Sequence, residues 1–180
     1  QGNSSLLRMV TLKMMLLTLE HGISPASPVA VGWYGALLCG VYDDIEKGYQ
    51  FGKWALEMQK RFGSKEYEAK LIFLFNVFIR PWKEHIGESL EPLRSVSQSG
   101  IGAGDLEYTY HCAVHYCCGL LCTGKPLEYI HQQQMEFLEI TGRYRLEFHN
   151  DFERIWGQMV LNFMGRSADP CQLRGELLAD

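Results

Sequence analysis

An acidic turn between two amphipathic segments constrains the fold of this chain more than any other feature. The turn is Tyr42-Asp43-Asp44-Ile45-Glu46-Lys47-Gly48-Tyr49. Small residues lie before, within and after it, at Ala36, Gly48 and Ala55, where they would let two helix backbones pack closely. This pattern predicts the elbow of an antiparallel helical hairpin, a building block that usually binds other molecules.

Proline, glycine and short polar residues mark the ends of further helices. Ser27 is the expected N-cap of a helix with Pro28 at its first position. Ser64 is expected to cap the helix over residues 65–80, and Asp105 the helix that reaches residue 123. Pro92 predicts a kink or an early boundary. The predicted helices cover residues 6–20, 27–41, 45–62, 65–80, 84–99, 105–123, 126–140 and 147–164.

Strand signals are almost absent, because no segment alternates apolar and polar residues over a sustained length. We therefore predict an all-α chain of about 7 to 8 helices, arranged as stacked antiparallel hairpins. The expected organisation is one helical-repeat domain over residues 1–180. Its parts are hairpins at about 27–63, 64–103 and 105–142, a glycine break at Gly100, Gly102 and Gly104, a loosely ordered tail after Ser167, and terminal helices at 6–21 and 147–164.

Composition excludes several classes of protein. The chain has 180 residues, of which 47% are hydrophobic, so it can bury a core. Its formal net charge of -4 provides no basic surface for nucleic acid. Arg8, Lys13 and Glu20 interrupt the apolar N-terminal segment, which argues against a membrane span or a signal peptide. Because the chain starts at Gln1, we expect a fragment of a larger protein.

Four of the six cysteines fall in one apolar segment that reads as a helix. A disulfide framework would distribute them over loops, so we expect reduced thiols and a cytoplasmic location. Within this segment His111, His115, Cys118 and Cys122 share a helical stripe and could in principle bind zinc. The alternative is that Cys packs as a small apolar residue, and we expect no metal. The neighbouring stripe, Tyr110, Val114, Cys117 and Leu121, should face the core.

Residues 44–49, with Ala36, Ala55 and Leu56, resemble a degenerate tetratricopeptide repeat. Four runs, at 35–39, 48–52, 78–85 and 104–108, resemble the helical region that follows the AAA-type (STAND-like) ATPase in large multidomain hybrid sensor kinases, which carry serine/threonine-kinase and histidine-kinase parts. The likeness covers about residues 12–165. It implies a tetratricopeptide-like right-handed superhelix that regulates signal transduction by binding protein and has no active site of its own.

Three patterns that could suggest catalysis have simpler explanations. The segment from Gly119 to Pro126 nearly matches a phosphate-binding loop, but Pro126 replaces the hydroxyl residue that holds magnesium. The acid pairs Glu136 with Glu139, and Asp151 with Glu153, are expected on solvated helix faces without a nucleophile nearby. We therefore predict neither an enzyme nor a bound cofactor.

The predicted ligand-binding residues are polar or aromatic residues on the first helix of each hairpin. They should line a concave groove that accepts a protein, a peptide or a small signal. An alternative is that the groove serves a small-molecule or metal sensor. The residues are Trp33, Tyr34, Asn76, Arg80, His111, His115 and Cys118.

Expected partners are proteins or peptides, including neighbouring domains of the same chain, but neither nucleic acid nor membrane. Apolar faces on terminal helices of a repeat array need cover. The first helix or the last one is therefore expected to mediate self-association, with a homodimer through these terminal helices as an expected form.

Overall fold

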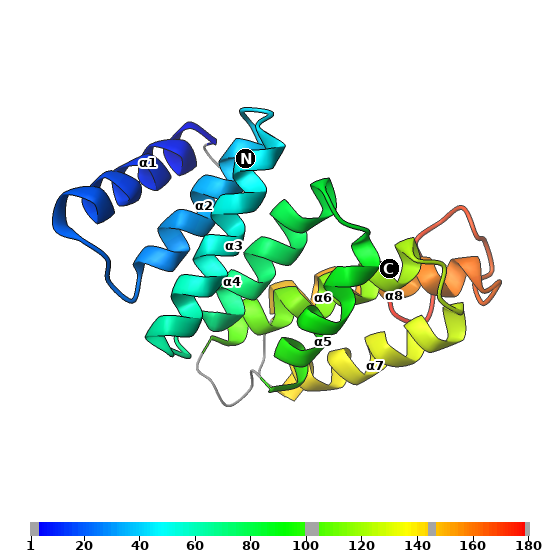
Figure 1. Ribbon diagram of the computed structural model, residues 1–180. Coiled ribbons are helices and arrows are strands. Elements are labelled where there is room, and N and C mark those ends of the chain that lie inside the picture. Colours follow the sequence, from blue (N-terminus) through cyan, green and yellow to red (C-terminus); the bar gives the residue numbers. More distant parts are fainter. Residues whose placement is uncertain (1–3, 100–104, 144–146, 179–180) are drawn as a thin grey trace. The chain divides into compact units, whose positions relative to one another are not determined.

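A computed structural model describes residues 4–99, 105–143 and 147–178, and these residues form helices and turns without any strand (Figure 1). This confirms the all-α prediction, whereas the superhelix stays a prediction. The α-helices are α1 (Ser4–His21), α2 (Ser27–Gly40), α3 (Ile45–Phe62), α4 (Glu68–Leu74), α5 (Leu90–Ser99), α6 (Leu106–Cys122), α7 (Leu127–Arg143) and α8 (Glu147–Phe163).

The chain divides into two compact units, Gln1–Cys112 and Ala113–Asp180. In the first unit, α1 packs on α2, and α2 forms an antiparallel hairpin with α3 (Figure 1). The Asp44 side chain caps α3 by accepting a hydrogen bond of 3.2 Å from the Lys47 amide. Gly63 ends α3 with a left-handed φ of 63°.

Glycine allows α2 and α3 to touch backbone to backbone. A Cβ on Gly48 would lie 2.7 Å from the carbonyl oxygen of Gly35 and 2.3 Å from Cys39 Sγ. Ala55 lies fully buried in the same hairpin. The small residues of the elbow therefore perform the packing role expected of them.

The predicted helix over residues 65–80 is wrong in detail. Instead of one α-helix over 65–80, α4 continues into a π-helix, η1 (Phe75–Ile79), and a 3-10 turn, η2 (Arg80–Trp82). The fully buried Ile79 fits against positions where α2 and α3 lack side chains: a Cβ on Gly35 or Gly52 would lie 3.2 Å or 2.9 Å from its Cδ1. Tertiary packing thus coincides with the local widening of the helix.

Other boundaries also differ. Ala26, not Ser27, occupies the N-cap of α2, and Ser64 caps nothing because α4 begins after Tyr67. The return segment begins as the 3-10 helix η3 (Ile86–Ser89) before α5. Pro92 therefore falls in the first turn of α5, where it is tolerated. The predicted glycine break at 100–104 lies outside the described residues.

The second unit contains the C-terminal half of α6, together with α7, α8 and the tail. The predicted loose tail is wrong, because α8 holds it by side-chain hydrogen bonds. Asn162 Nδ2 donates to the carbonyl oxygens of Pro170 and Gln172, and Gln158 Oε1 accepts from the Leu177 amide at 3.0 Å. The tail therefore forms a strap along α8.

The segment that resembled a phosphate-binding loop is a helix end. The Gly124 amide donates to the Leu121 carbonyl, the Lys125 amide donates to the Leu120 carbonyl, and Gly124 has a φ of 68°. Pro126 then precedes α7. The glycine and proline thus end one helix and begin the next, as their capping preferences predict.

Among the helices of the described residues, none combines the length and apolar character needed to cross a membrane.

Candidate functional site

Aromatic rings form a continuous row across three helices of the first unit. Trp33 of α2 contacts Phe78 of η1 with ring centroids 6.0 Å apart, and Phe78 contacts Phe73 of α4 at 5.6 Å. Phe73 then stacks on His111 of α6 at 5.2 Å and meets the Tyr108 edge at 5.6 Å. We call Trp33, Phe78, Phe73, His111 and Tyr108 the aromatic row.

The aromatic row is anchored in the core and open to solvent at one end. Phe73 is only 7% exposed, whereas Phe78 is 41% exposed and Trp33 is half-buried. Lys70 extends the row with its ammonium group 4.6 Å from the Tyr108 ring centroid. Rigid aromatic surface beside a cation suits recognition of apolar or aromatic side chains, because little side-chain entropy is lost on binding.

Tyr34 lies apart from the row. Its ring packs edge-on against Phe51 of α3 at 5.0 Å, and Phe51 packs in turn against Trp54 at 5.1 Å. Trp54 is 50% exposed. The structure therefore places Tyr34 in a second aromatic group, between α2 and α3.

Asn76 and Arg80 form an internal hydrogen-bond network. Asn76 is buried, donates to the Ile72 carbonyl at 2.8 Å and accepts from Arg80 Nη1 at 2.7 Å. Arg80 Nη1 also donates to the Glu88 carbonyl at 2.7 Å, and Arg80 Nε lies 3.2 Å from a Glu84 oxygen. These contacts tie η1 to η3, so they give Arg80 a structural role.

The network extends to α3 through two further contacts. The Tyr49 hydroxyl donates to Glu84, which raises the pKa of Tyr49, and Lys83 pairs with Glu46. Lys83 also lies 5.1 Å from the Tyr49 ring centroid. These contacts hold the segment around Lys83 and Glu84 against the start of α3.

His115 and Cys118 belong to the second unit, whereas His111 belongs to the first. Of the stripe on α6 that was predicted to face the core, Tyr110, Val114 and Cys117 are buried and Leu121 is half-buried. His111 and Cys118 are also half-buried. Burial raises the pKa of the Cys118 thiol to about 12, so this thiol stays protonated at neutral pH. Within the described ranges, no three His, Cys, Asp or Glu side chains meet to hold a metal ion.

Among the four acidic residues predicted to lie on solvated helix faces, Glu153 is the exception because it is buried. The other acids, Glu136, Glu139 and Asp151, are exposed as expected, but Glu153 is only 1% exposed on the inner face of α8. Among the residues that the structure describes, neither of its carboxylate oxygens has a well-formed hydrogen bond, and the Cys117 thiol is a weak partner close by. Burial raises its pKa from 4.5 to about 7, and the nearby Cys117 thiol offsets part of that rise.

Phe73, Phe78 and Tyr108 were not among the binding residues predicted from sequence. Their apolar character suggested core positions, and only Phe73 is fully buried. On an ordinary α-helix the five-residue spacing of Phe73 and Phe78 would point them about 140° apart, and the π-helix, with more residues per turn, brings them closer to one face. A signal was nevertheless present, since aromatic residues recur on the first helix of each predicted hairpin.

Comparison with known proteins finds a similarity to a signal-transduction kinase. Over 145 residues, or 79% of this chain, the sequence is 23% identical to "Hybrid signal transduction histidine kinase G" of Dictyostelium discoideum. No protein-family model matches the chain, and no solved structure matches it. The chain spans only 4% of the length of that kinase. Its similarity is therefore to a short stretch of a signal-transduction kinase.

Proposed function

We propose that this chain is a non-catalytic helical module that binds a protein or peptide and thereby regulates a signal-transduction kinase. The aromatic row is the observation that carries the proposal. It joins the first helices of successive hairpins, and its open end presents Trp33 and Phe78 to solvent. The similarity to a hybrid histidine kinase supports the signalling context.

The ligand surface in this proposal is narrower than the seven residues chosen from sequence. Trp33 and His111 belong to the aromatic row, whereas Asn76 and Arg80 stabilise the connection between η1 and η3. A partner with an apolar or aromatic anchor would pack on Trp33 and Phe78, and Lys70, at the Tyr108 end of the row, would favour an acidic residue further along the same partner. Such a partner is a short segment of a neighbouring domain or of another protein.

The proposal includes a cytoplasmic location and no chemistry within the chain. All six cysteines are free thiols, which suits a reducing compartment. Kinase and ATPase activities would belong to other parts of a longer protein. Incubation of the purified chain with labelled ATP tests this directly, and phosphate transfer or hydrolysis by the pure chain would contradict it.

Selection from a displayed peptide library tests the binding surface. Peptides selected on the wild-type chain should lose at least about tenfold in affinity for a Trp33→Ala/Phe78→Ala variant, because the anchor loses its packing surface. Trp82→Ala is the matched control, since Trp82 is 53% exposed but lies outside the aromatic row. Equal affinity for the wild type and the double variant would overturn the proposed surface.

A further inference from the structure

The strap, residues 167–178, is fitted to α8 at two glycines. A Cβ on Gly157 would lie 2.6 Å from Leu177 Cδ1, and a Cβ on Gly175 would lie 2.7 Å from Gln158 Nε2. Gly175 also has a φ of 152°, which residues with a side chain rarely adopt. Gln158 holds this part of the strap by accepting a hydrogen bond of 3.0 Å from the Leu177 amide. The strap therefore lies on α8 in one defined position.

Leu177 fills the space next to Glu153. Glu153 lies one turn before Gly157, on the same buried face of α8. Because the Cα–Cβ bonds of a helix tilt toward its N-terminus, a side chain at position 157 would lean toward Glu153. Leu177 takes that place, since its Cδ1 lies 2.6 Å from the position of the missing Cβ. The strap thus covers the helix surface beside Glu153.

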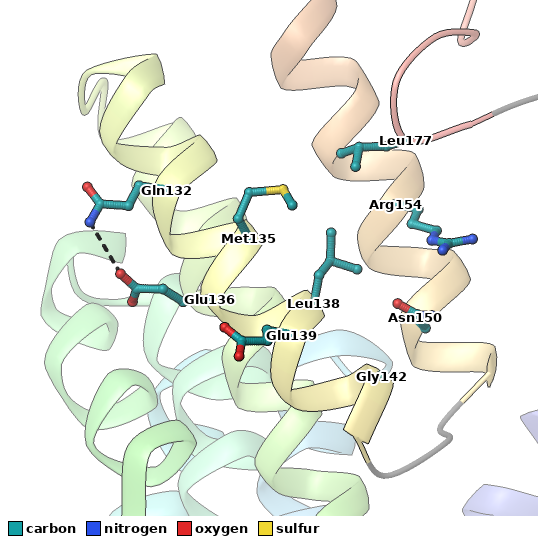
Figure 2. A pocket seen from close by; sticks show the side chains of 9 residues that line it. All are labelled: Gln132, Met135, Glu136, Leu138, Glu139, Gly142, Asn150, Arg154 and Leu177. Atoms are coloured by element: carbon teal, nitrogen blue, oxygen red, sulfur yellow. Dashed lines mark hydrogen bonds between the residues drawn. The ribbon is translucent and has the colours of Figure 1, made fainter.

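An open groove between α7 and α8, with a volume of about 840 Å³, reaches the same part of α8 (Figure 2). On α8 the groove is lined by Asn150 and Arg154, which flank Glu153 along the helix, and Leu177 of the strap lines it as well. Solvent in this groove is therefore close to Glu153, yet the Glu153 side chain is only 1% exposed. Leu177 is one of the groups that separate this carboxyl from the groove.

Among the described residues, the groups that surround Glu153 provide no buried positive charge. On α6 its titratable neighbours are the thiols of Cys117 and Cys118, and burial raises the pKa of both, so they stay neutral at neutral pH. On α7 the groove is lined by the exposed acids Glu136 and Glu139. The charged residues on the adjoining parts of α8 and the strap are exposed, namely Asp151, Arg154, Asp169, Arg174 and Glu176. An ionised Glu153 would thus lack both water and a counter-charge.

Of the elements around Glu153, the strap opens at the least cost. Helices α6 and α7 have 17 residues each. The strap contains neither helix nor strand, and its residues are exposed except at positions 167, 177 and 178, which are half-buried. Terminal segments with little buried surface open before packed helices do. Water therefore reaches an ionised Glu153 most easily when the strap moves.

From these features we infer that the strap is a proton-dependent switch, which closes on α8 while the Glu153 carboxyl is protonated and opens when that carboxyl loses its proton. Opening removes Leu177 from the groove and uncovers more of its apolar floor, which includes Met135 and Leu138.

The direction of this switch follows from proton linkage. Burial raises the pKa of Glu153 from 4.5 to about 7, so the closed strap keeps the proton over a range in which a hydrated carboxyl loses it. Opening therefore becomes more favourable as the pH rises from 4.5 to 7, and levels off above that range. If opening hydrates the carboxyl fully, the equilibrium constant for opening increases by about 300-fold over this range.

Hydrogen exchange of the Leu177 amide in the full chain measures strap closure, because this amide donates to Gln158. Its protection factor should fall at least about tenfold between pH 5 and pH 8, and should not respond to low concentrations of urea. The amide of Leu161, a fully buried residue of α8, should exchange more slowly and respond to urea, because it requires unfolding. Glu153→Gln should make the Leu177 protection factor independent of pH.

Three results of this experiment would overturn the inference. The first is a Leu177 protection factor that is the same at pH 5 and pH 8 in the wild type. The second is a pH dependence that persists in Glu153→Gln. The third is a Leu177 amide with the same urea dependence as Leu161, since the strap would then open only when α8 unfolds.

Truncation of Leu177 tests the same linkage from the side of the strap. Leu177→Ala removes the cover beside Glu153, so the titration midpoint of the Glu153 carboxyl, followed by carbon-detected nuclear magnetic resonance, should fall by at least about one pH unit. Leu173→Ala is the matched control, because Leu173 is a strap leucine that is 50% exposed. Circular dichroism checks that both variants keep their helices. A Glu153 midpoint that is equal in Leu177→Ala and the wild type would contradict the inference, and none of these results depends on the aromatic row.

Discussion

Two ionisable side chains, the half-buried Arg80 in the first unit and the buried Glu153 in the second, have opposite surroundings. Arg80 contacts Asn76, Glu84 and the Glu88 carbonyl, so its charge is compensated on several sides. Glu153 is more deeply buried, and among the described residues its carboxylate has no well-formed hydrogen bond. The comparison shows that one charge helps to define a local structure, whereas the other opposes the packing around it.

Removal of the Arg80 charge should give the largest effect. Arg80→Met leaves the Asn76 oxygen and the Glu88 carbonyl without this donor and removes the ion-pair partner of Glu84, and should lower the free energy of unfolding by about 3 to 4 kcal/mol. Urea titration measures the loss. Lys47→Met is the control, because the ion pair of Lys47 with Asp44 is exposed and should matter little. If both variants lost the same small free energy of unfolding, the Arg80 charge would not stabilise the fold, and the proposed difference from Glu153 would be wrong.

The pH dependence of the second unit should be nearly as large. Because the folded protein keeps the Glu153 proton up to about pH 7, whereas the unfolded chain loses it near 4.5, the folded state binds more protons between these values. Stability should therefore fall as the pH rises through this range, by about 3 kcal/mol in total, and level off above it. Hydrogen exchange of the α8 amides at several pH values measures this local stability.

Replacing Glu153 by a permanently neutral side chain tests whether its charge causes the pH dependence of stability. Glu153→Gln should abolish the pH dependence and stabilise the second unit by about 2 kcal/mol at pH 8, less than the full electrostatic effect because the amide is also buried without a partner. Asp151→Asn is the control, since Asp151 is exposed on the same helix and its variant should keep the wild-type profile. A pH dependence that survives in Glu153→Gln would assign it to another group.

Loss of one outer contact of the Arg80 network should have the smallest effect. Tyr49→Phe removes only the hydroxyl that donates to Glu84, and should cost about 1 kcal/mol. Thermal unfolding detects such a difference. Tyr42→Phe, at an exposed tyrosine, should leave the melting temperature unchanged. A larger loss in Tyr42→Phe than in Tyr49→Phe would contradict the role of the network.

Local rules predicted much of the fold. Asp44 and Gly63 delimit α3 through capping preferences that depend on a few neighbouring residues, and the small residues of the elbow follow from backbone sterics. The π-helix could not be predicted in this way, because it involves the packing of Ile79 against glycines 27 or more residues away in sequence. Secondary structure in this segment depends on tertiary contacts.

The candidate site was only partly predictable for the same reason. Trp33 and His111 were selected from sequence, but the rings that connect them, Phe73 and Phe78, looked like ordinary core residues. Glu153 lies two residues from the exposed Asp151 in a polar stretch, so composition suggested solvent. Its burial depends on which face of α8 meets α6, and one sequence without its partners in space does not give that information.

The proposed function depends on the partner binding at the open end of the aromatic row, where Trp33 and Phe78 reach solvent. Nuclear magnetic resonance of the chain with a selected peptide tests it most directly, because each tryptophan gives a separate indole signal. If the partner binds there, the Trp33 indole signal and the His111 backbone signal should shift on binding, whereas the Trp82 indole signal should not. Shifts confined to Trp82, Trp54 or Trp156, with the Trp33 signal unchanged at saturation, would contradict it.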